Sequence, residues 1–178
     1  MTLLRRWVID VNRFIVAVLV NNRFGVLNRV TSMFRRRQFN ISALTVSETE
    51  SKETSRITVT FEGEENNKQQ LINQLYKLPD VISIEEFNRE NSISFELLLI
   101  KMKNEPESRQ MILSTADTFK AEIVDYTKES ITIRLTEDSS RIDDFIDVMR
   151  EYTILEICRT GIVSLGKGST TIRQTINL

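Results

Sequence analysis

The amino-acid sequence predicts an α+β fold in which one unit, with the element order βαββαβ, occurs twice. Apolar runs of strand length alternate with amphipathic stretches of helical length, and the same order of elements appears in each half of the chain. A polar stretch at Asn88–Ser92 separates the two halves. The chain's 178 residues suit two small domains. The prediction is therefore two ferredoxin-like domains, with antiparallel sheets and helices on one face of each sheet.

The first domain is predicted over residues 1–89, with residues 1–12 as an extension. The run at 14–20 is apolar at every position, which is typical of a central strand covered on both faces. The stretch at 56–62 alternates, so its threonines are expected to face away from the core. The other elements are expected as strands at 41–48 and 81–87, and as helices at 26–37 and from about Asn67 to the turn before Pro79.

The second domain is predicted over residues 90–178. Its expected elements are strands at 93–102, 122–126, 130–136 and 154–163, and helices at 106–119 and 140–152. Cys158, the single cysteine, lies among apolar residues and is expected to be buried. From about Gly166 onward the chain is predicted to be a flexible tail.

The strand at 41–48 is expected at an edge of the first sheet, because the strand order in this topology is 4-1-3-2. Its sequence, ISALTVSE from Ile41, contains neither proline nor lysine, which commonly protect an exposed edge. An unprotected edge favours pairing, and a second copy of the chain is the simplest partner. We therefore expect a homodimer through the first domains, with one continuous sheet.

The composition argues against several classes of function. The chain contains no histidine, the usual general base and the commonest metal ligand, so no catalytic or metal-binding residues are predicted. A net charge of −1 and the lack of an aromatic RNA-stacking motif argue against nucleic-acid binding. There is no run of roughly 20 apolar residues to span a bilayer and no signal peptide. No membrane association and a cytoplasmic location are therefore expected.

A candidate ligand site lies where the first strand leads into the first helix. Gly25 permits a tight turn and close approach by a ligand, and the first amides of a helix favour a carboxylate or phosphate. Nearby amide side chains and apolar side chains complete a site for a zwitterion with an apolar side chain, an aliphatic amino acid. The candidate residues are Asn22, Phe24, Gly25, Val26, Leu27, Asn40 and Ile41. The same pattern also occurs as an ordinary turn and helix cap.

The stretch VLVNNRFGVLNRVTSMFRRRQFNISALTVSETE, from Val18 to Glu50, resembles the regulatory (small) subunits of acetolactate synthase, also called acetohydroxyacid synthase. The resemblance continues in EICRTGIVSLGKG, from Glu156, and covers about Phe14 to Gly168. It identifies the first domain as an ACT domain. Family members bind valine or another branched-chain product between two ACT domains, where the turn of one chain faces the second strand of the other. By this resemblance, the amides around Gly25 would hold the ligand's carboxylate.

The resemblance also implies a regulatory role without catalysis. Such a chain would bind and activate the large catalytic subunit and make it sensitive to feedback inhibition by a branched-chain amino acid. Thiamine diphosphate, Mg²⁺ and FAD would belong to that larger subunit, so no cofactor is expected in this chain. The alternative is a free-standing ACT-domain sensor that regulates another enzyme or transcription.

Three positions depart from the family pattern. Gln38 stands where the family has glycine, and a left-handed backbone there would cost roughly 1 kcal/mol with a non-glycine residue. Phe24 replaces a common proline, and Ala43 replaces a common serine. A separate stretch, GIVSLGKGST from Gly161, is close to a phosphate-binding loop, but Gly168 replaces its Ser or Thr. Nucleotide binding is not predicted.

Overall fold

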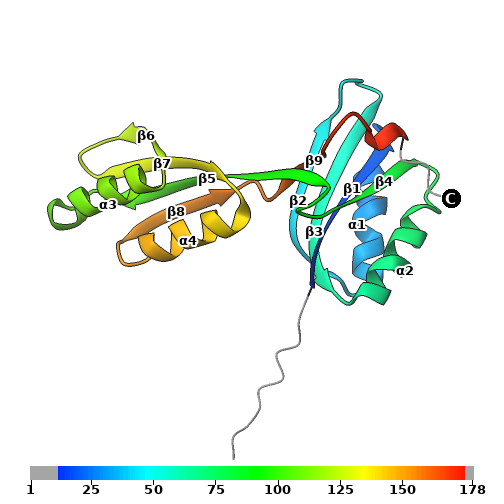
Figure 1. Ribbon diagram of the computed structural model, residues 1–178, viewed down its shortest axis with the longest axis horizontal. Coiled ribbons are helices and arrows are strands. Elements are labelled where there is room, and N and C mark those ends of the chain that lie inside the picture. The colour runs from blue at the N-terminus through cyan, green and yellow to red at the C-terminus, as the bar shows by residue number, and fades with distance from the viewer. Residues whose placement is uncertain (1–11, 175–178) are drawn as a thin grey trace, which may run out of the picture.

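The computed structural model describes residues 12–174 and contains two antiparallel sheets, each with two helices (Figure 1). The first sheet has the order β2-β3-β1-β4, and the second has the order β6-β7-β5-β8. Elements of the first half are β1 (Asn12–Asn21), α1 (Val26–Arg36), β2 (Asn40–Glu48), β3 (Thr54–Gly63), α2 (Glu65–Leu75) and β4 (Val81–Phe87). Those of the second half are β5 (Ser92–Lys103), α3 (Pro106–Thr118), β6 (Glu122–Tyr126), β7 (Ser130–Glu137), α4 (Ser139–Met149) and β8 (Ile154–Arg159). The predicted fold class and strand order are confirmed, and β2 is an edge strand.

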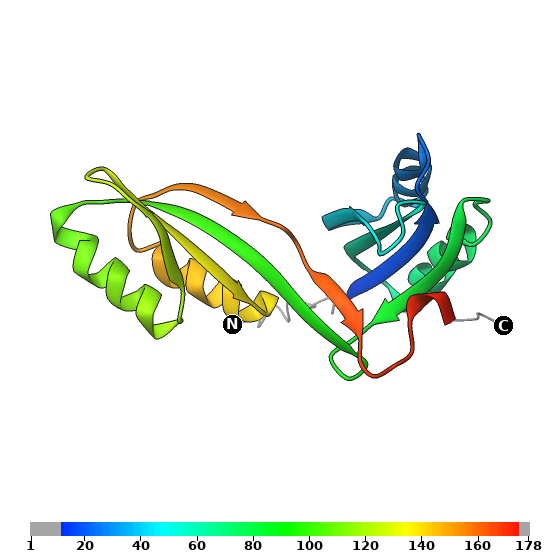
Figure 2. The ribbon, with the colours of Figure 1, turned by 90° about the horizontal axis from the view of Figure 1, so that it is seen from above.

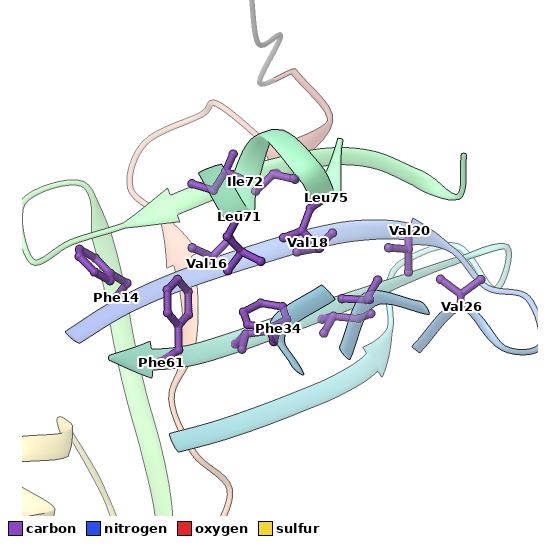
Figure 3. Close-up of a cluster of buried hydrophobic side chains, with 14 residues drawn as sticks. Phe14, Val16, Val18, Val20, Val26, Phe34, Phe61, Leu71, Ile72 and Leu75 are labelled. Atoms are coloured by element: carbon purple, nitrogen blue, oxygen red, sulfur yellow. The ribbon is translucent and has the colours of Figure 1, made fainter. Parts of the chain in front are cut away.

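The first core lies between the sheet and the helices α1 and α2 (Figure 3). Alternate residues of β1 enter this core, and Phe61 of β3 stands near its centre. The ring of Phe61 lies 5.1 to 5.6 Å, centroid to centroid, from the rings of Phe14, Phe34 and Phe39. Tilted and edge-on contacts at such distances add to the hydrophobic stabilisation of the domain.

The second core has the same construction, with apolar residues of β5 and β7 facing α3 and α4. Leu98, Ile100 and Met102 of β5 are fully buried there. Cys158 pairs with Leu99, one position out of phase with these core residues, and therefore lies on the opposite face of the sheet. It is exposed, so the prediction that it is buried is wrong.

The C-terminal part of the chain differs from the prediction. The expected strand 154–163 is interrupted, because β8 ends at Arg159 and Gly161 adopts a φ of 78°. A separate strand, β9 (Val163–Gly166), then pairs with the first residues of β5, and a short 3₁₀ helix, η1 (Ile172–Gln174), follows. Figure 2 shows this segment running from the second domain back to the first. Residues 161–174 are here termed the C-terminal arm, and its part from Gly166 to Gln174 is packed rather than the flexible tail that was predicted.

The C-terminal arm packs on the face of the first sheet that the helices leave open. A Cβ placed on Gly161 would lie 2.6 Å from the Cβ of Ala43, and Ser83 Oγ donates to the carbonyl of Ile172 at 2.6 Å. On the same face, Thr58 and Thr60 are 5% and 1% exposed, respectively. They point away from the core as predicted, but into a second packed layer rather than into solvent. The predicted N-terminal extension lies outside the described residues, apart from Asn12 at the start of β1.

Candidate functional site

The turn from β1 into α1 is centred on Gly25, whose φ of 81° and ψ of −3° are left-handed. Such a backbone costs an L-residue roughly 1–2 kcal/mol, which explains the glycine. No side chain caps the start of α1. The first amides of a helix have no acceptor within the helix, so this turn can present N–H groups to an anionic ligand.

Asn22 ties the end of β1 to the turn between β2 and β3. Its Nδ2 donates to the carbonyl of Lys52 at 2.9 Å and to Oε1 of Glu48 at 3.3 Å, while its backbone N–H donates to Glu53 at 2.7 Å. Within residues 12–174 the side-chain oxygen accepts no hydrogen bond. That oxygen can therefore accept a hydrogen bond from a ligand's ammonium group.

The three apolar residues around Gly25 have different surroundings. Val26 is 3% exposed and belongs to the first core, and its N–H donates within the turn to the carbonyl of Arg23 at 3.3 Å. Leu27 is 41% exposed, and Phe24 is fully exposed. Val26 therefore anchors the turn, whereas Phe24 and Leu27 are accessible to a ligand or a partner chain.

Asn40 and Ile41 lie at the other end of α1 from Gly25. They begin β2, directly after the turn that follows the helix. The helix has 11 residues, which corresponds to a length of about 16 Å at 1.5 Å per residue. Within one chain, the structure does not bring Asn40 and Ile41 to the Gly25 turn, so only β2 of another copy could add them to it.

Arg29 lies beside the candidate site, although the sequence analysis did not include it among the candidate residues. A Cβ placed on Gly25 would lie 3.3 Å from Nη1 of Arg29, so the guanidinium group lies beside the turn. Its Nη2 atom is held by Asp80 Oδ2 at 2.6 Å, and Asp80 is 8% exposed. The spacing could have shown this, because residues four apart are neighbours on a helix. Arg29 places a positive charge where the first amides of α1 also favour an anion.

Gln38 occupies the left-handed position after α1, with a φ of 58°. The N–H of the next residue, Phe39, donates to the carbonyl of Phe34 at 3.1 Å, which closes the helix end. The departure from glycine noted in the sequence therefore falls at a position where glycine relieves strain. The turn forms nonetheless, and Asn40 begins β2 directly after it.

Residues 12–174 contain no group of three or more His, Cys, Asp or Glu side chains arranged to hold a metal ion. None of their helices is both long enough and apolar enough to cross a membrane.

The βαββαβ fold and the Gly25 turn define the first domain as a member of the ACT-domain class, and the comparison with known families agrees with this assignment. Residues 16–83 match a family described as "AHAS small subunit-like ACT domain". The first domain is thus an ACT domain, as the sequence predicted. Residues 95–168 match a second family, "Small subunit of acetolactate synthase".

Whole-chain relatives carry the same description. The chain is 44% identical to the "Probable acetolactate synthase small subunit" of Archaeoglobus fulgidus, over 86% of this chain and 96% of that protein. It is 38% identical to the small subunit of Bacillus subtilis, over 87% and 91% of the respective chains. The crystal structure of the Thermotoga maritima small subunit superposes with a TM-score of 0.81 at 32% identity, covering 90% of this chain and all of the other. The chain belongs to the acetolactate synthase small subunit family.

Proposed function

We propose that this chain binds the large catalytic subunit of acetolactate synthase, raises its activity and makes it sensitive to inhibition by a branched-chain amino acid, with valine as the first candidate. The chain itself is proposed to be non-catalytic, with thiamine diphosphate, Mg²⁺ and FAD held by the larger subunit. The observation that carries the effector proposal is the Gly25 turn, with its open helix start beside the Arg29 guanidinium.

The effector site is proposed to be shared between two copies of the chain. Because the N–H of Val26 already donates to Arg23, the amides of Gly25 and of the residues after Val26 in the first turn of α1 would bind the carboxylate, and Asn22 would accept from the ammonium group. Asn40 and Ile41 of the other copy would close the site, because they are about a helix length from Gly25 in their own chain. Pairing of two β2 edges would bring the copies together in a homodimer.

Inhibition through such a site requires the effector to bind one arrangement of the subunits more tightly than another. A coupling free energy of about 1–3 kcal/mol changes affinity by roughly 5–150-fold. The coupling is reciprocal for binding, so the catalytic subunit is expected to alter the affinity of this chain for valine by the same factor. Such a site needs no catalytic group, because its output is a shift in the equilibrium of another protein.

The test is reconstitution of the enzyme from the purified catalytic subunit and this chain, followed by titration with valine. We expect Gly25→Asp to abolish inhibition and to leave activation, because the new carboxylate repels the ligand's carboxylate and can pair with Arg29. Gly25→Asn is the matched control, since asparagine tolerates a left-handed backbone and has nearly the same shape without the charge. Unchanged inhibition in Gly25→Asp would refute the site, and failure to bind or activate the catalytic subunit would refute the regulatory function.

A further inference from the structure

We propose that a second small-molecule site lies between the open face of the first sheet and the C-terminal arm, and that it binds a small zwitterion the size of an α-amino acid. A cavity of about 380 Å³ occupies this position. Its volume falls within the range of roughly 300–1,000 Å³ that is usual for ligand pockets. Arg56 would bind the carboxylate, Glu85 would bind the ammonium group, and Leu19 would form part of the apolar floor.

Arg56 brings a partly buried positive charge to this cavity. It lies on β3 opposite Leu19 of β1, and its guanidinium carbon stands 5.3 Å from the centre of the Phe87 ring. Nη2 donates to the carbonyl of Ser164 in the C-terminal arm at 2.6 Å. Among residues 12–174 no carboxylate lies within 4 Å of the guanidinium, and burial lowers the pKa of Arg56. Most of its five N–H donors are left for a ligand.

Glu85 brings a negative charge to the same cavity from β4. Its Oε1 lies 2.9 Å from the position that a Cβ on Gly166 would take, so the carboxylate is covered by the C-terminal arm. Burial raises the pKa of Glu85, and the positive charge of Arg56 partly offsets that rise. In the described part of the chain its carboxylate makes no direct hydrogen bond or ion pair. A partly desolvated carboxylate without a direct partner gains from binding a cation.

The two charges restrict the class of ligand. A ligand with only a carboxylate would leave Glu85 unpaired, and a ligand with only an amine would leave Arg56 unpaired. A phosphate group is disfavoured, because the cavity lining carries three carboxylates, Glu48, Glu50 and Glu85, against two guanidinium groups, Arg56 and Arg173, and would repel a dianion. Lys167 of the glycine-rich stretch donates outside the cavity, to the carbonyls of Arg89 and Glu90 at 3.0 and 3.1 Å.

The proposed second site is separate from the Gly25 turn. Gly25 begins α1, which packs on the opposite face of the first sheet, where the first core lies. A ligand between Arg56, Glu85 and the arm would contact β3, β4 and residues that follow the second domain. Its binding would therefore favour the state in which the arm is seated on the first sheet.

The test is a titration of the ¹⁵N-labelled full-length chain with valine, followed by amide chemical shifts. Two analogues that each retain one charge are compared: 3-methylbutanoate lacks the ammonium group, and 2-methylpropan-1-amine lacks the carboxylate. We expect valine to shift the amides of Leu19 and of Leu165–Thr171, and neither analogue to do so at equal concentration. Absence of these shifts at millimolar valine would overturn the proposal, and so would equal binding of 3-methylbutanoate.

Variants then assign the shifts to the second site. We expect Glu85→Gln, which is isosteric, and Arg56→Met each to weaken valine binding there at least tenfold, as loss of a charged hydrogen-bond partner does. Glu90→Gln, in the exposed turn after β4, is the control and should leave binding unchanged. Because Arg56→Met also removes the bond to Ser164 and can release the arm, Glu85→Gln decides the assignment, with thermal unfolding showing that it folds.

The outcome is distinguishable from that of the proposed effector site. In Gly25→Asp the shifts at Leu165–Thr171 should persist while those in the first turn of α1 disappear. If the arm shifts are also lost in that variant, they report the Gly25 site, and the second site is refuted.

Discussion

Glu96 and Arg159 form a bidentate ion pair at the place where the chain leaves the second sheet for the first. Nε of Arg159 lies 2.7 Å from Oε1 of Glu96, and Nη2 lies 2.9 Å from Oε2. The side chain of Glu96 is only 3% exposed, and Ser139 Oγ donates to Oε2 at 3.0 Å. Arg159 also holds Asp143 at 2.8 Å. The pair joins β5, β8 and the start of α4 immediately before Gly161 redirects the chain.

Removal of Arg159 is expected to be strongly destabilising. Arg159→Leu would leave the buried Glu96 carboxylate with Ser139 as its remaining partner, and breaking a buried pair in this way costs about 3–5 kcal/mol. Urea unfolding at neutral pH measures the cost. Arg150→Leu is the control, because its pair with Asp147 is exposed and should contribute no more than about 1 kcal/mol. Equal losses of unfolding free energy in the two variants would contradict the larger contribution expected of the buried Glu96–Arg159 pair.

Glu96 is also expected to make stability depend on acid pH. Burial alone would raise the pKa of Glu96, but the bonds from Arg159 and Ser139 outweigh it, so the pKa lies below its ordinary value of 4.5. The unfolded chain then binds the proton more readily than the folded chain. The stabilisation is present above the ordinary value and is lost as the pH falls through the lower folded value.

The measurement is the free energy of unfolding of the parent chain and of Glu96→Gln between about pH 7 and pH 3. The variant should be less stable at neutral pH and should lose less stability on acidification, because glutamine does not titrate. Parallel curves for the two proteins would show that Glu96 does not contribute to the acid dependence.

Replacing Gln38 by glycine is expected to stabilise the chain. A residue other than glycine in the left-handed region destabilises the folded chain by roughly 1–2 kcal/mol. Glycine removes that strain but makes the unfolded chain more flexible, which costs about 0.4–1 kcal/mol. The free energy of unfolding should therefore rise by a net amount of about 0.5–1 kcal/mol. Lys120, after α3, has the same φ of 58°, so Lys120→Gly should also stabilise the chain. Arg37→Gly, at a φ of −100°, is the control and should be destabilising. Thermal or urea unfolding shows whether each substitution stabilises or destabilises the chain.

Arg29 is expected to contribute to effector binding without being needed for assembly. Arg29→Met removes the positive charge beside Gly25, and loss of a charged hydrogen-bond donor should weaken valine binding about tenfold or more. The valine titration followed by the amide shifts of the first turn of α1 measures the change, because these shifts report this site and not the proposed second site. Asp80→Asn, which leaves the charge of Arg29 in place but removes its partner, is the comparison and should have the smaller effect. Unaltered affinity in Arg29→Met would exclude Arg29 from the site.

Local sequence determined most of the fold. The apolar run in β1, the alternation of β3 and the helical periodicity of α1 each reflect burial of one face, so their types were predictable and their ends agree within a few residues. Even the strained position at Gln38 was identifiable, because the glycine of the family pattern marks it. The Gly25 turn was found for the same reason, since a left-handed backbone leaves a local trace in the choice of residue.

The C-terminal arm was missed because nothing in its own sequence requires it to pack. Val163–Gly166 becomes a strand only because β5 extends beyond the second sheet and offers unpaired backbone groups. Cys158 was misplaced because its side of β8 depends on register with β5. A shift of one residue moves a side chain to the other face, and register is set between strands distant in sequence.

Residue types and their spacing were enough to predict two βαββαβ domains, a glycine-opened helix and an unprotected edge strand, because these features depend on hydrophobic period and on local backbone sterics. Tertiary structure alone decided that the arm covers the first sheet and that Arg56 and Glu85 share a cavity with it. These relationships join segments far apart in the chain. Their energies come from contacts between the first sheet and the arm that form only in the folded chain, so no local pattern records them.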